Sequence, residues 1–408
     1  MRQRNRQMAL LALLFAVACL LPSAAASQAP IRIRAGTLID GRGGVQRDVI
    51  IVIDSGRIRQ IVSGGTGPVT YDLSAGTVLP GLIDTHVHIG SHFGKDGRAG
   101  NQGETEAEQV LYAAENAYQT LMAGFTTVQS IGAPEDVALR DAIARGRLPG
   151  PRLLTSISSL TDTSLTPAQI RQWVRDVAGR GADLIKIFAS KSIREGGAQT
   201  LSDEQIRAAC EEAKAQRKRI WVHAHAASAI RAAATAGCFA VTHGSQVTAQ
   251  ELRLMAEHGT FFEPNIGLVS QNYIENKARY LGFGNYTEEG FAFMERGIPL
   301  KLDMFRHALQ EPRLKLIMGT DATAGAHGQN AREIIYRVQV AGQSAREALL
   351  GATSLAAEAL GLGDRIGAIR PGFAADVIAL DGDPMLDITA LRRVVFVMKA
   401  GTVYKNAR

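Results

Sequence analysis

The sequence predicts an α/β protein: a (β/α)8 (TIM) barrel over residues 80–365, with a small β-sandwich domain built from both chain ends. Three observations lead to this fold. The middle of the chain alternates short β-branched runs with capped helical stretches, which predicts a parallel sheet. Both ends contain strand-like segments instead. No glycine-rich phosphate loop follows the first strand of the middle, which disfavours a doubly wound sheet.

Residues 1–26 have the three parts of a secretory signal peptide in their usual order. Arg2, Arg4 and Arg6 make a positive start, Met8 to Leu21 is almost wholly apolar, and Ala24-Ala25-Ala26 is a small-residue cleavage site. Because the apolar run is too short to span a bilayer comfortably, a retained anchor is disfavoured. We therefore expect cleavage after Ala26, no stable membrane anchor afterwards, and a periplasmic or secreted protein.

The β domain is expected to comprise residues 27–79 and 366–408. In the first segment, Ile31–Arg34 alternates apolar and charged residues, and Val49–Ile53 is an unbroken apolar run. In the second segment, Ala375–Leu380 has the same character. Because two β-rich ends flank a different middle, we expect their strands to pair with one another.

Barrel strands are predicted where short runs of apolar and β-branched residues occur between helix signals. Thr166, Ser202 and Ser344 each precede a Gln or Glu by three residues, which is typical of a capped helix start. Eight strand–helix units over roughly 280 residues fit a (β/α)8 barrel. The eight strands are Leu82–Val87, Thr126–Val128, Arg152–Leu154, Leu184–Phe188, Ile220–Val222, Phe239–Val241, Thr260–Phe262 and Lys315–Met318.

The composition is that of a soluble globular enzyme, with 46% hydrophobic and 21% charged residues. The net charge of +6 is modest, and no long Lys/Arg run is interleaved with aromatic residues, so we expect no nucleic-acid binding. After signal removal only Cys210 and Cys238 remain. An oxidising compartment would allow a disulfide between them. Because both lie in stretches typical of a helix or a helix-to-strand turn, we favour two buried free thiols.

Residue types that bind metals occur at the ends of the predicted strands. His86 and His88 are two apart on the first strand, so they point to the same side and are spaced to share one metal ion. In a (β/α)8 barrel the carboxyl ends of the strands meet at one mouth, where further candidates would converge. A single strand histidine is more often a core residue, but the His-x-His spacing favours a metal site. The further candidates are Lys186, His223, His243 and Asp321.

Several short motifs give the chain a wider resemblance. With the tail Gly372–Val377, they resemble the amidohydrolase superfamily over essentially all of the mature sequence. Within it the chain looks most like the imidazolonepropionase-related group, which includes Xaa-Pro dipeptidases, lysine/arginine carboxypeptidases and ochratoxin-hydrolysing amidases. The motifs are Pro80-Gly81-Leu82-Ile83-Asp84-Thr85-His86-Val87-His88, Ile185-Lys186-Ile187, Val222-His223-Ala224-His225, Thr242-His243-Gly244 and Gly319-Thr320-Asp321-Ala322.

The resemblance implies two divalent metal ions, which we expect to be Zn²⁺ because neutral imidazoles suit zinc. His86, His88 and Asp321 would hold the more buried ion, and His223 and His243 would hold the second ion. Asp321 would also act as the base, because in this superfamily it takes the proton from a hydroxide that bridges the two metals.

The same resemblance implies that Lys186 is carboxylated by CO₂ and bridges the two ions. Burial favours the free amine that this reaction requires. His225 lies on the same side of its strand as His223, so either can be the ligand there; we prefer His223, with His225 supporting the ligands or contacting substrate.

Two loops are expected to shape the substrate site. His327 follows the last strand in a glycine-flanked loop, where a substrate contact and a loop contact are equally open. His92, just past the first strand, has a weaker claim to substrate. The segment Asn265–Glu288 is longer than a plain connection and is expected to form a lid.

These features predict an amide-cleaving hydrolase whose substrate is a dipeptide or an N-acyl amino acid with a free carboxylate. Ochratoxin-like amides belong to the same class. The alternatives are an imidazolone or cyclic amide hydrolase, a deaminase and a lactonase; the bridging Lys186 disfavours a deaminase. A ligand-binding protein on an inactive scaffold is the alternative outside enzymes. The expected partners are a small-molecule or dipeptide substrate and further copies of the chain in a homo-oligomer.

We predict that the mature protein begins at Ser27. The arginines, the apolar run and the Ala24–Ala26 site together specify cleavage at this point. Intact-mass measurement on protein made in an export-competent host should give the mass of residues 27–408. A form without residues 1–26 should retain full activity, whereas a mature protein that still begins at Met1 would contradict the prediction.

Overall fold

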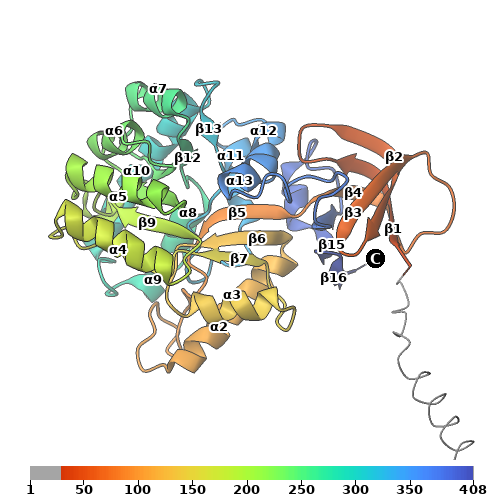
Figure 1. The fold of residues 1–408 in the computed structure, drawn as a ribbon, viewed down its shortest axis with the longest axis horizontal. Helices are drawn as coiled ribbons and strands as arrows, with labels where there is room; N and C mark the ends of the chain where they lie inside the picture. The colour runs from red at the N-terminus through yellow and green to blue at the C-terminus, as the bar shows by residue number, and fades with distance from the viewer. Residues whose placement is uncertain (1–28, 408) are drawn as a thin grey trace, which may run out of the picture. The chain divides into compact units, whose positions relative to one another are not determined.

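The computed structural model describes residues 29–407, so the predicted signal peptide lies outside the described residues. The strands form three sheets, two of them parallel, with helices packed against the parallel ones (Figure 1). This is the predicted α/β class. Among the described helices, none is both long enough and apolar enough to cross a membrane.

One sheet combines the two ends of the chain, as the sequence predicts. Strand β4 is its meeting point, because it pairs with β1 on one side and antiparallel with β14 on the other, where Val78 lies opposite Ala379. The β-sandwich form of this sheet stays a prediction. In spatial order the sheet contains β16 (Thr402–Asn406), β15 (Val394–Lys399), β14 (Val377–Leu380), β4 (Tyr71–Pro80), β1 (Ile31–Ile39), β2 (Val45–Asp54) and β3 (Arg57–Ser63).

The middle of the chain forms the two parallel sheets. All eight predicted strands are present, and a short additional strand, β8, pairs with β9. The three-stranded sheet contains β5 (Leu82–Val87), β6 (Phe125–Ser130) and β7 (Arg152–Thr155). The six-stranded sheet contains β13 (Lys315–Leu316), β12 (Phe261–Glu263), β11 (Ala240–His243), β10 (Arg219–Ala224), β9 (Leu184–Phe188) and β8 (Ser159–Leu160).

Backbone hydrogen bonds join the two parallel sheets beside β5. The amide of Asp321 donates to the carbonyl of His86 at 2.8 Å, and the amide of His88 donates to the carbonyl of Ala322 at 2.8 Å. The end of β5 therefore lies next to the segment that follows β13. Among the described strands, no ladder joins β5 to β13 or β7 to β8, so two parallel sheets result, and the closed eight-stranded barrel stays a prediction.

The predicted helix starts are confirmed. Thr166 and Ser202 accept the backbone N–H of Gln169 and Gln205 in reciprocal capping boxes, and Ser344 accepts the N–H of Glu347. Helices α4 to α7 pack against β9 to β12 (Figure 1). The helices are α2 (Glu106–Met122), α3 (Asp136–Ala144), α4 (Pro167–Gly179), η1 (Ile193–Glu195), α5 (Asp203–Ala215), α6 (Ala227–Thr235), α7 (Ala249–His258), α8 (Leu268–Glu275), α9 (Lys277–Tyr280), α10 (Glu288–Ala308), α11 (Ala331–Gln339), α12 (Ala345–Gly351), α13 (Ser354–Ala359) and η2 (Ile388–Arg392).

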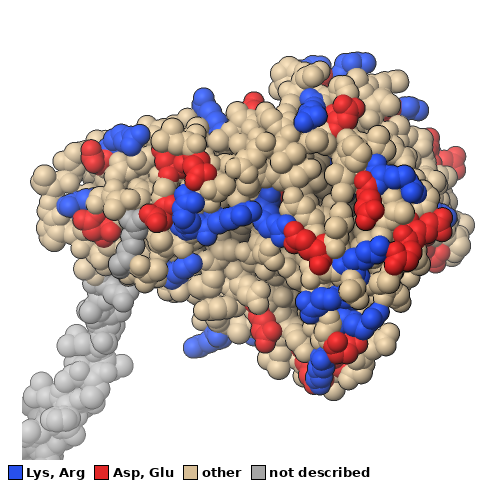
Figure 2. Space-filling view, turned by 180° about the vertical axis from the view of Figure 1, so that it is seen from behind, with Lys and Arg blue, Asp and Glu red and all other residues tan. Residues whose placement is uncertain are grey.

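Charged side chains of both signs are mixed on the surface. On the face in Figure 2, Lys and Arg side chains cross the middle in a short row, with Asp and Glu side chains beside them. Ion pairs between opposite charges are frequent at the surface, for example Lys315 with Glu358 at 2.8 Å. On this face, therefore, positive and negative side chains lie close together.

Cys210 and Cys238 form a disulfide, which corrects our preference for two free thiols. Cys210 lies on α5, and Cys238 lies in the turn just before β11, with 5.1 Å between their Cα atoms. Each residue occupies the kind of element that the sequence predicts. The sequence pattern does not reveal, however, that the end of α6 brings this turn against the buried face of α5, and that packing decides the pairing.

Loss of this disulfide should destabilise the fold. In the double variant Cys210→Ser/Cys238→Ser, the unfolding free energy should fall by about 2–4 kcal/mol, because the cross-link restricts the unfolded chain. Urea unfolding of the form lacking residues 1–26 measures the change, and thiol titration of the unfolded, unreduced protein should detect no free thiol. Two reactive thiols, or an unchanged unfolding midpoint in the double variant, would refute the prediction.

Candidate metal centre

The first group of potential ligands comes from β5 and from the segment after β13. His86 lies on β5, His88 directly follows that strand, and Asp321 contacts both. The Asp321 Oδ1 atom lies 3.0 Å from His88 Nε2 and 3.4 Å from His86 Nε2. One ligand atom from each residue lies within 4.8 Å of the others, a spacing that suits one metal ion.

The second group consists of three buried histidines. His223 lies on β10, His225 directly follows it, and His243 ends β11. The ring centroids of His223 and His243 are 4.4 Å apart, and those of His225 and His243 are 5.0 Å apart. A nitrogen from each ring lies within 4.8 Å of the others. The choice between His223 and His225 as the ligand from this strand stays open, because both rings belong to the group.

Lys186 lies between these groups on β9. Its side chain is fully buried and lines the same cavity as both histidine groups, a space of about 290 Å³. Its Nζ atom donates to Thr242 Oγ1 at 3.4 Å, a long contact. Burial lowers the pKa of Lys186 to about 8. A larger fraction of this lysine is therefore in the neutral amine form at neutral pH than of a lysine in water.

The protonation states of the site suit a bound cation. Burial lowers the pKa of His86 and lowers those of His223 and His243 further. Although burial acts to raise the pKa of Asp321, its contacts with His86 and His88 hold it well below its usual range. The cavity thus presents unprotonated imidazoles beside an ionised carboxylate, which is the donor set that divalent transition metals prefer.

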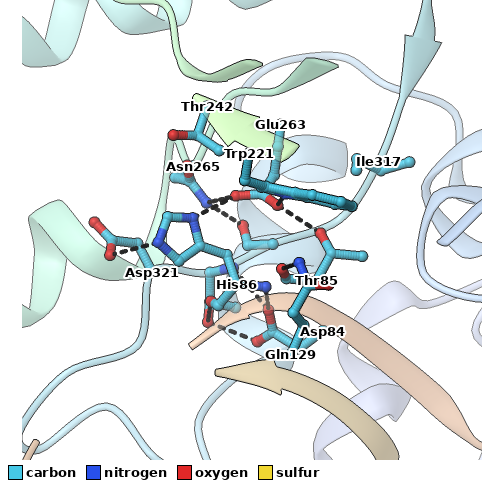
Figure 3. A network of polar contacts seen from close by, with 12 residues as sticks. Asp84, Thr85, His86, Gln129, Trp221, Thr242, Glu263, Asn265, Ile317 and Asp321 are labelled. Atoms are coloured by element: carbon cyan, nitrogen blue, oxygen red, sulfur yellow. Dashed lines mark hydrogen bonds and ion pairs between the residues drawn. The ribbon is translucent and has the colours of Figure 1, made fainter. Parts of the chain in front are cut away.

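A fully buried carboxylate, Glu263, orients His86 (Figure 3). Its Oε1 atom lies 2.6 Å from His86 Nδ1, while Oε2 accepts hydrogen bonds from Thr85 Oγ1 at 2.6 Å and from Trp221 Nε1 at 3.1 Å. Because Nδ1 donates to this carboxylate, the lone pair of His86 lies on Nε2, the atom that faces Asp321. Gly319 leaves the space for Glu263: a Cβ atom there would lie 2.4 Å from Glu263 Cδ.

Asp84 joins β5 to the turn that carries Asp321. Its carboxylate accepts from Thr320 Oγ1 at 2.6 Å and from Asn330 Nδ2 at 2.7 Å, and also from the backbone N–H of Thr320. Burial raises the pKa of Asp84 to about 7. Asp321 itself has φ +56°, a left-handed conformation that few non-glycine residues adopt. The Asp84 contacts therefore hold the turn in the geometry that presents Asp321.

His327 and His92 lie outside the wall of this cavity. His327 is buried, and its Nε2 lies 3.1 Å from the carbonyl oxygen of Ser91, so it contacts the loop after β5. His92 stacks on Tyr112 and lies 2.8 Å from Glu104. Of the two contacts expected for His327, the loop contact is the one observed, and a catalytic role through the Ser91 loop stays a prediction.

The predicted lid segment forms α8 and α9 and contributes to the cavity wall. Ser270 and Tyr273 from α8 line the cavity, as do Arg194 from η1 and Lys301 from α10. The guanidinium of Arg194 lies over the ring of Tyr286, 4.0 Å from its centroid. Two positive side chains thus lie beside the candidate metal ligands.

Comparison with known proteins decides the family. The sequence profile described as "Amidohydrolase family" matches residues 77–405. The chain belongs to the amidohydrolase family. An Aspergillus niger ochratoxinase is 26% identical over 92% of this chain and 86% of its own length. The structure of a Xaa-Pro dipeptidase with bound methionine has a TM-score of 0.84 and 31% identity, over 93% of this chain and 100% of that chain.

A further solved structure, a prolidase complexed with n-methylphosphonate-l-proline, has a TM-score of 0.80 and 25% identity, over 92% of this chain and 100% of that chain. Imidazolonepropionase of Rhodococcus jostii is 25% identical over 86% of this chain and 86% of its own length. With such relatives, this amidohydrolase is a hydrolase that acts on C–N bonds. The family generally depends on divalent metal, which agrees with the two groups of ligands.

Sequence reasoning missed the residues that support the ligands in this amidohydrolase. Glu263 directly follows the predicted strand Thr260–Phe262, so its position at a strand end could have marked it as a candidate site residue. Its contacts with Thr85 and His86 join residues 178 and 177 positions apart, and no local pattern reveals such pairs. Lys301 lies on an amphipathic helix, and the sequence pattern of this helix does not predict that the Lys301 side chain is buried.

Glu263→Gln should weaken metal binding. The amide removes the charge that holds His86 in its tautomer, and the loss of such a supporting contact typically reduces metal affinity by about 10–100-fold. Competition with a chromophoric chelator measures the affinity, and near-ultraviolet circular dichroism checks the fold. Glu358→Gln, at an exposed carboxylate paired with Lys315, is the control and should keep the wild-type affinity. Equal affinities for all three proteins would contradict the role of Glu263.

Proposed function

We propose that this amidohydrolase is a binuclear zinc enzyme that cleaves the amide bond of a dipeptide or an N-acyl amino acid with a free carboxylate. Ochratoxin-like amides fall within this class. The observation that carries the proposal is the arrangement of two three-residue ligand groups and the buried Lys186 around one cavity. The ochratoxinase and the Xaa-Pro dipeptidase among its relatives favour an amide substrate.

The scaffold that we propose is the closed (β/α)8 barrel, with the small β domain folded as a sandwich. The parallel bridge between Val87 and Ala322 supports closure beside β5. On the other side, the amide of Asp183 donates to the carbonyl of Thr155, which brings the end of β7 next to β9. In such a barrel the ligands all lie at the carboxyl ends of the strands.

In this proposal His86, His88 and Asp321 hold one zinc ion, and His223 and His243 hold the other. When bound, the ions would lower the pKa of the attacking water and polarise the scissile carbonyl. The family relationship favours divalent metal in general, and the imidazole-rich donor set favours zinc.

Lys186 is proposed to carry a carbamate that bridges the two ions. Its neutral amine attacks the carbon of CO₂, an N–C bond forms while one C=O π bond opens to leave a negative oxygen, and the nitrogen loses one proton to solvent, so that the neutral amine becomes an anionic carbamate. The low pKa of Lys186, about 8, supplies the neutral amine near neutral pH. The fully buried position keeps the product among its ligand neighbours.

Asp321 is proposed as the base. One carboxylate oxygen accepts the proton of the attacking water and then delivers it to the nitrogen of the leaving amine. Its pKa is held low by His86 and His88, so its carboxylate is ionised at neutral pH. The left-handed turn and the Asp84 contacts keep it directed at the histidines.

Of the alternatives, a cyclic amide hydrolase has a specific observation in its favour, and an inactive scaffold has one against it. The imidazolonepropionase relative favours a cyclic amide substrate, for which the same residues would serve. An inactive ligand-binding scaffold would require only the cavity, although every expected ligand is present.

We further propose that the protein is exported and forms homo-oligomers. The Cys210–Cys238 disulfide supports export, because such bonds persist in oxidising compartments.

Turnover by metal-loaded protein tests the proposal. We expect Asp321→Asn to lower kcat by at least about 10²-fold, because the amide accepts no proton and general-base catalysis contributes about 10²–10⁴-fold. Dipeptides, N-acyl amino acids, an ochratoxin-like amide and a cyclic imidazolone make the substrate panel, and metal analysis accompanies each assay. Asp303→Asn, on the exposed face of α10, is the control. No hydrolysis of any acyclic amide, or full activity in Asp321→Asn, would refute the proposal.

A further inference from the structure

Two buried or half-buried cations line the cavity of the candidate metal centre and have no carboxylate partner. Within residues 29–407, no Asp or Glu oxygen lies within 4.0 Å of the Lys301 ammonium or the Arg194 guanidinium. Lys301 is only 6% exposed. The buried Arg337, in contrast, is paired with Glu333 at 2.9 Å, as the cost of burying a charge normally requires. The two unpaired cations point to a missing anion.

Both cations are held in place before any ligand arrives. The Lys301 Nζ atom donates to Ser270 Oγ at 3.2 Å, which uses one of its three N–H donors. Arg194 Nε donates to Asn285 Oδ1 at 2.7 Å, and Asn285 Nδ2 in turn donates to Glu195 at 2.7 Å. The ring of Tyr286 supports the face of the Arg194 guanidinium. Such preorganisation lowers the entropy cost of binding an anion.

The neighbouring cavity has the opposite character. This space of about 320 Å³ shares His88 and Tyr286 with the first cavity, so the two are adjacent. No Lys or Arg is among the described residues that line it, whereas Glu135 is. A substrate that spans both cavities would therefore place a negative group on the side of Lys301 and Arg194 and its other part beyond His88.

We propose that Lys301 and Arg194 bind the free carboxylate of the amino acid that leaves, while the acyl part occupies the cavity beyond His88. The inference rests on the proposed function and adds the orientation of the substrate in the site. It restricts the substrates to amides in which the leaving amine carries an α-carboxylate, so the enzyme removes a single C-terminal residue. An amide in place of that carboxylate would leave two cations unpaired in the complex.

Paired substrates test this assignment. For the best substrate found with the metal-loaded enzyme, kcat/KM is compared with that of the same compound carrying a C-terminal carboxamide. The wild type should prefer the acid by at least about 10–100-fold, as expected for charge-assisted hydrogen bonds. In Lys301→Met and Arg194→Met this ratio should approach one. Arg194→Lys should keep part of it, and Arg296→Met, at an exposed position on the same helix as Lys301, should keep all of it.

Equilibrium binding separates this inference from the proposed function. Calorimetric titration with L-methionine and L-methioninamide requires no turnover, and metal content is measured for each variant. A preference for L-methionine that Lys301→Met and Arg194→Met abolish, with metal content unchanged, supports the carboxylate site even if no amide is hydrolysed. Equal affinity for the two compounds in the wild type, or an unchanged preference in both variants, overturns the carboxylate site. Hydrolysis of acid and carboxamide with equal kcat/KM overturns it as well, and leaves the amide-cleaving function intact.

Discussion

The contact between Glu263 and His86 is the interaction on which the candidate site depends. Glu263 ends β12 in the six-stranded sheet, and His86 lies on β5 in the three-stranded sheet, so their 2.6 Å contact ties the two parallel sheets together at the site. Glu263 carries a buried charge, and the hydrogen bonds that it accepts from His86, Thr85 and Trp221 offset the cost of burying it. Burial therefore enforces the contact, and the contact fixes the orientation of the ring that faces Asp321.

The cavity around this contact contains several titratable side chains whose pKa values are shifted. Burial lowers the pKa of His223 and brings that of Lys186 down to about 8, whereas the contacts with His86 and His88 keep Asp321 ionised. In the same cavity, Lys301 and Arg194 have no carboxylate partner among the described residues. The cavity therefore offers ligand atoms for a metal cation and N–H donors for an anionic group.

The sequence predicted the parts of the molecule that local patterns encode. The strand that carries His86 was predicted with the bounds that it has, His88 directly follows it, and Ser202 caps its helix as expected. Residues joined only by packing were beyond such patterns, since Glu263 meets His86 across 177 positions. The disulfide escaped for the same reason, because helix periodicity does not tell which neighbour Cys210 faces. Closure of the sheet depends on β13, which is too short to carry a clear signal.

Gly319 has a consequence for natural variation in this chain. A methyl group at this position would compete with Glu263 for the same space, since their atoms would lie 2.4 Å apart. A variant with alanine at 319 would keep every candidate ligand, yet the displaced carboxylate would release the His86 ring. A sequence that retains all of its metal-binding residues can therefore lose metal affinity through one small substitution outside the ligand set, and a check of the ligands alone would overlook it.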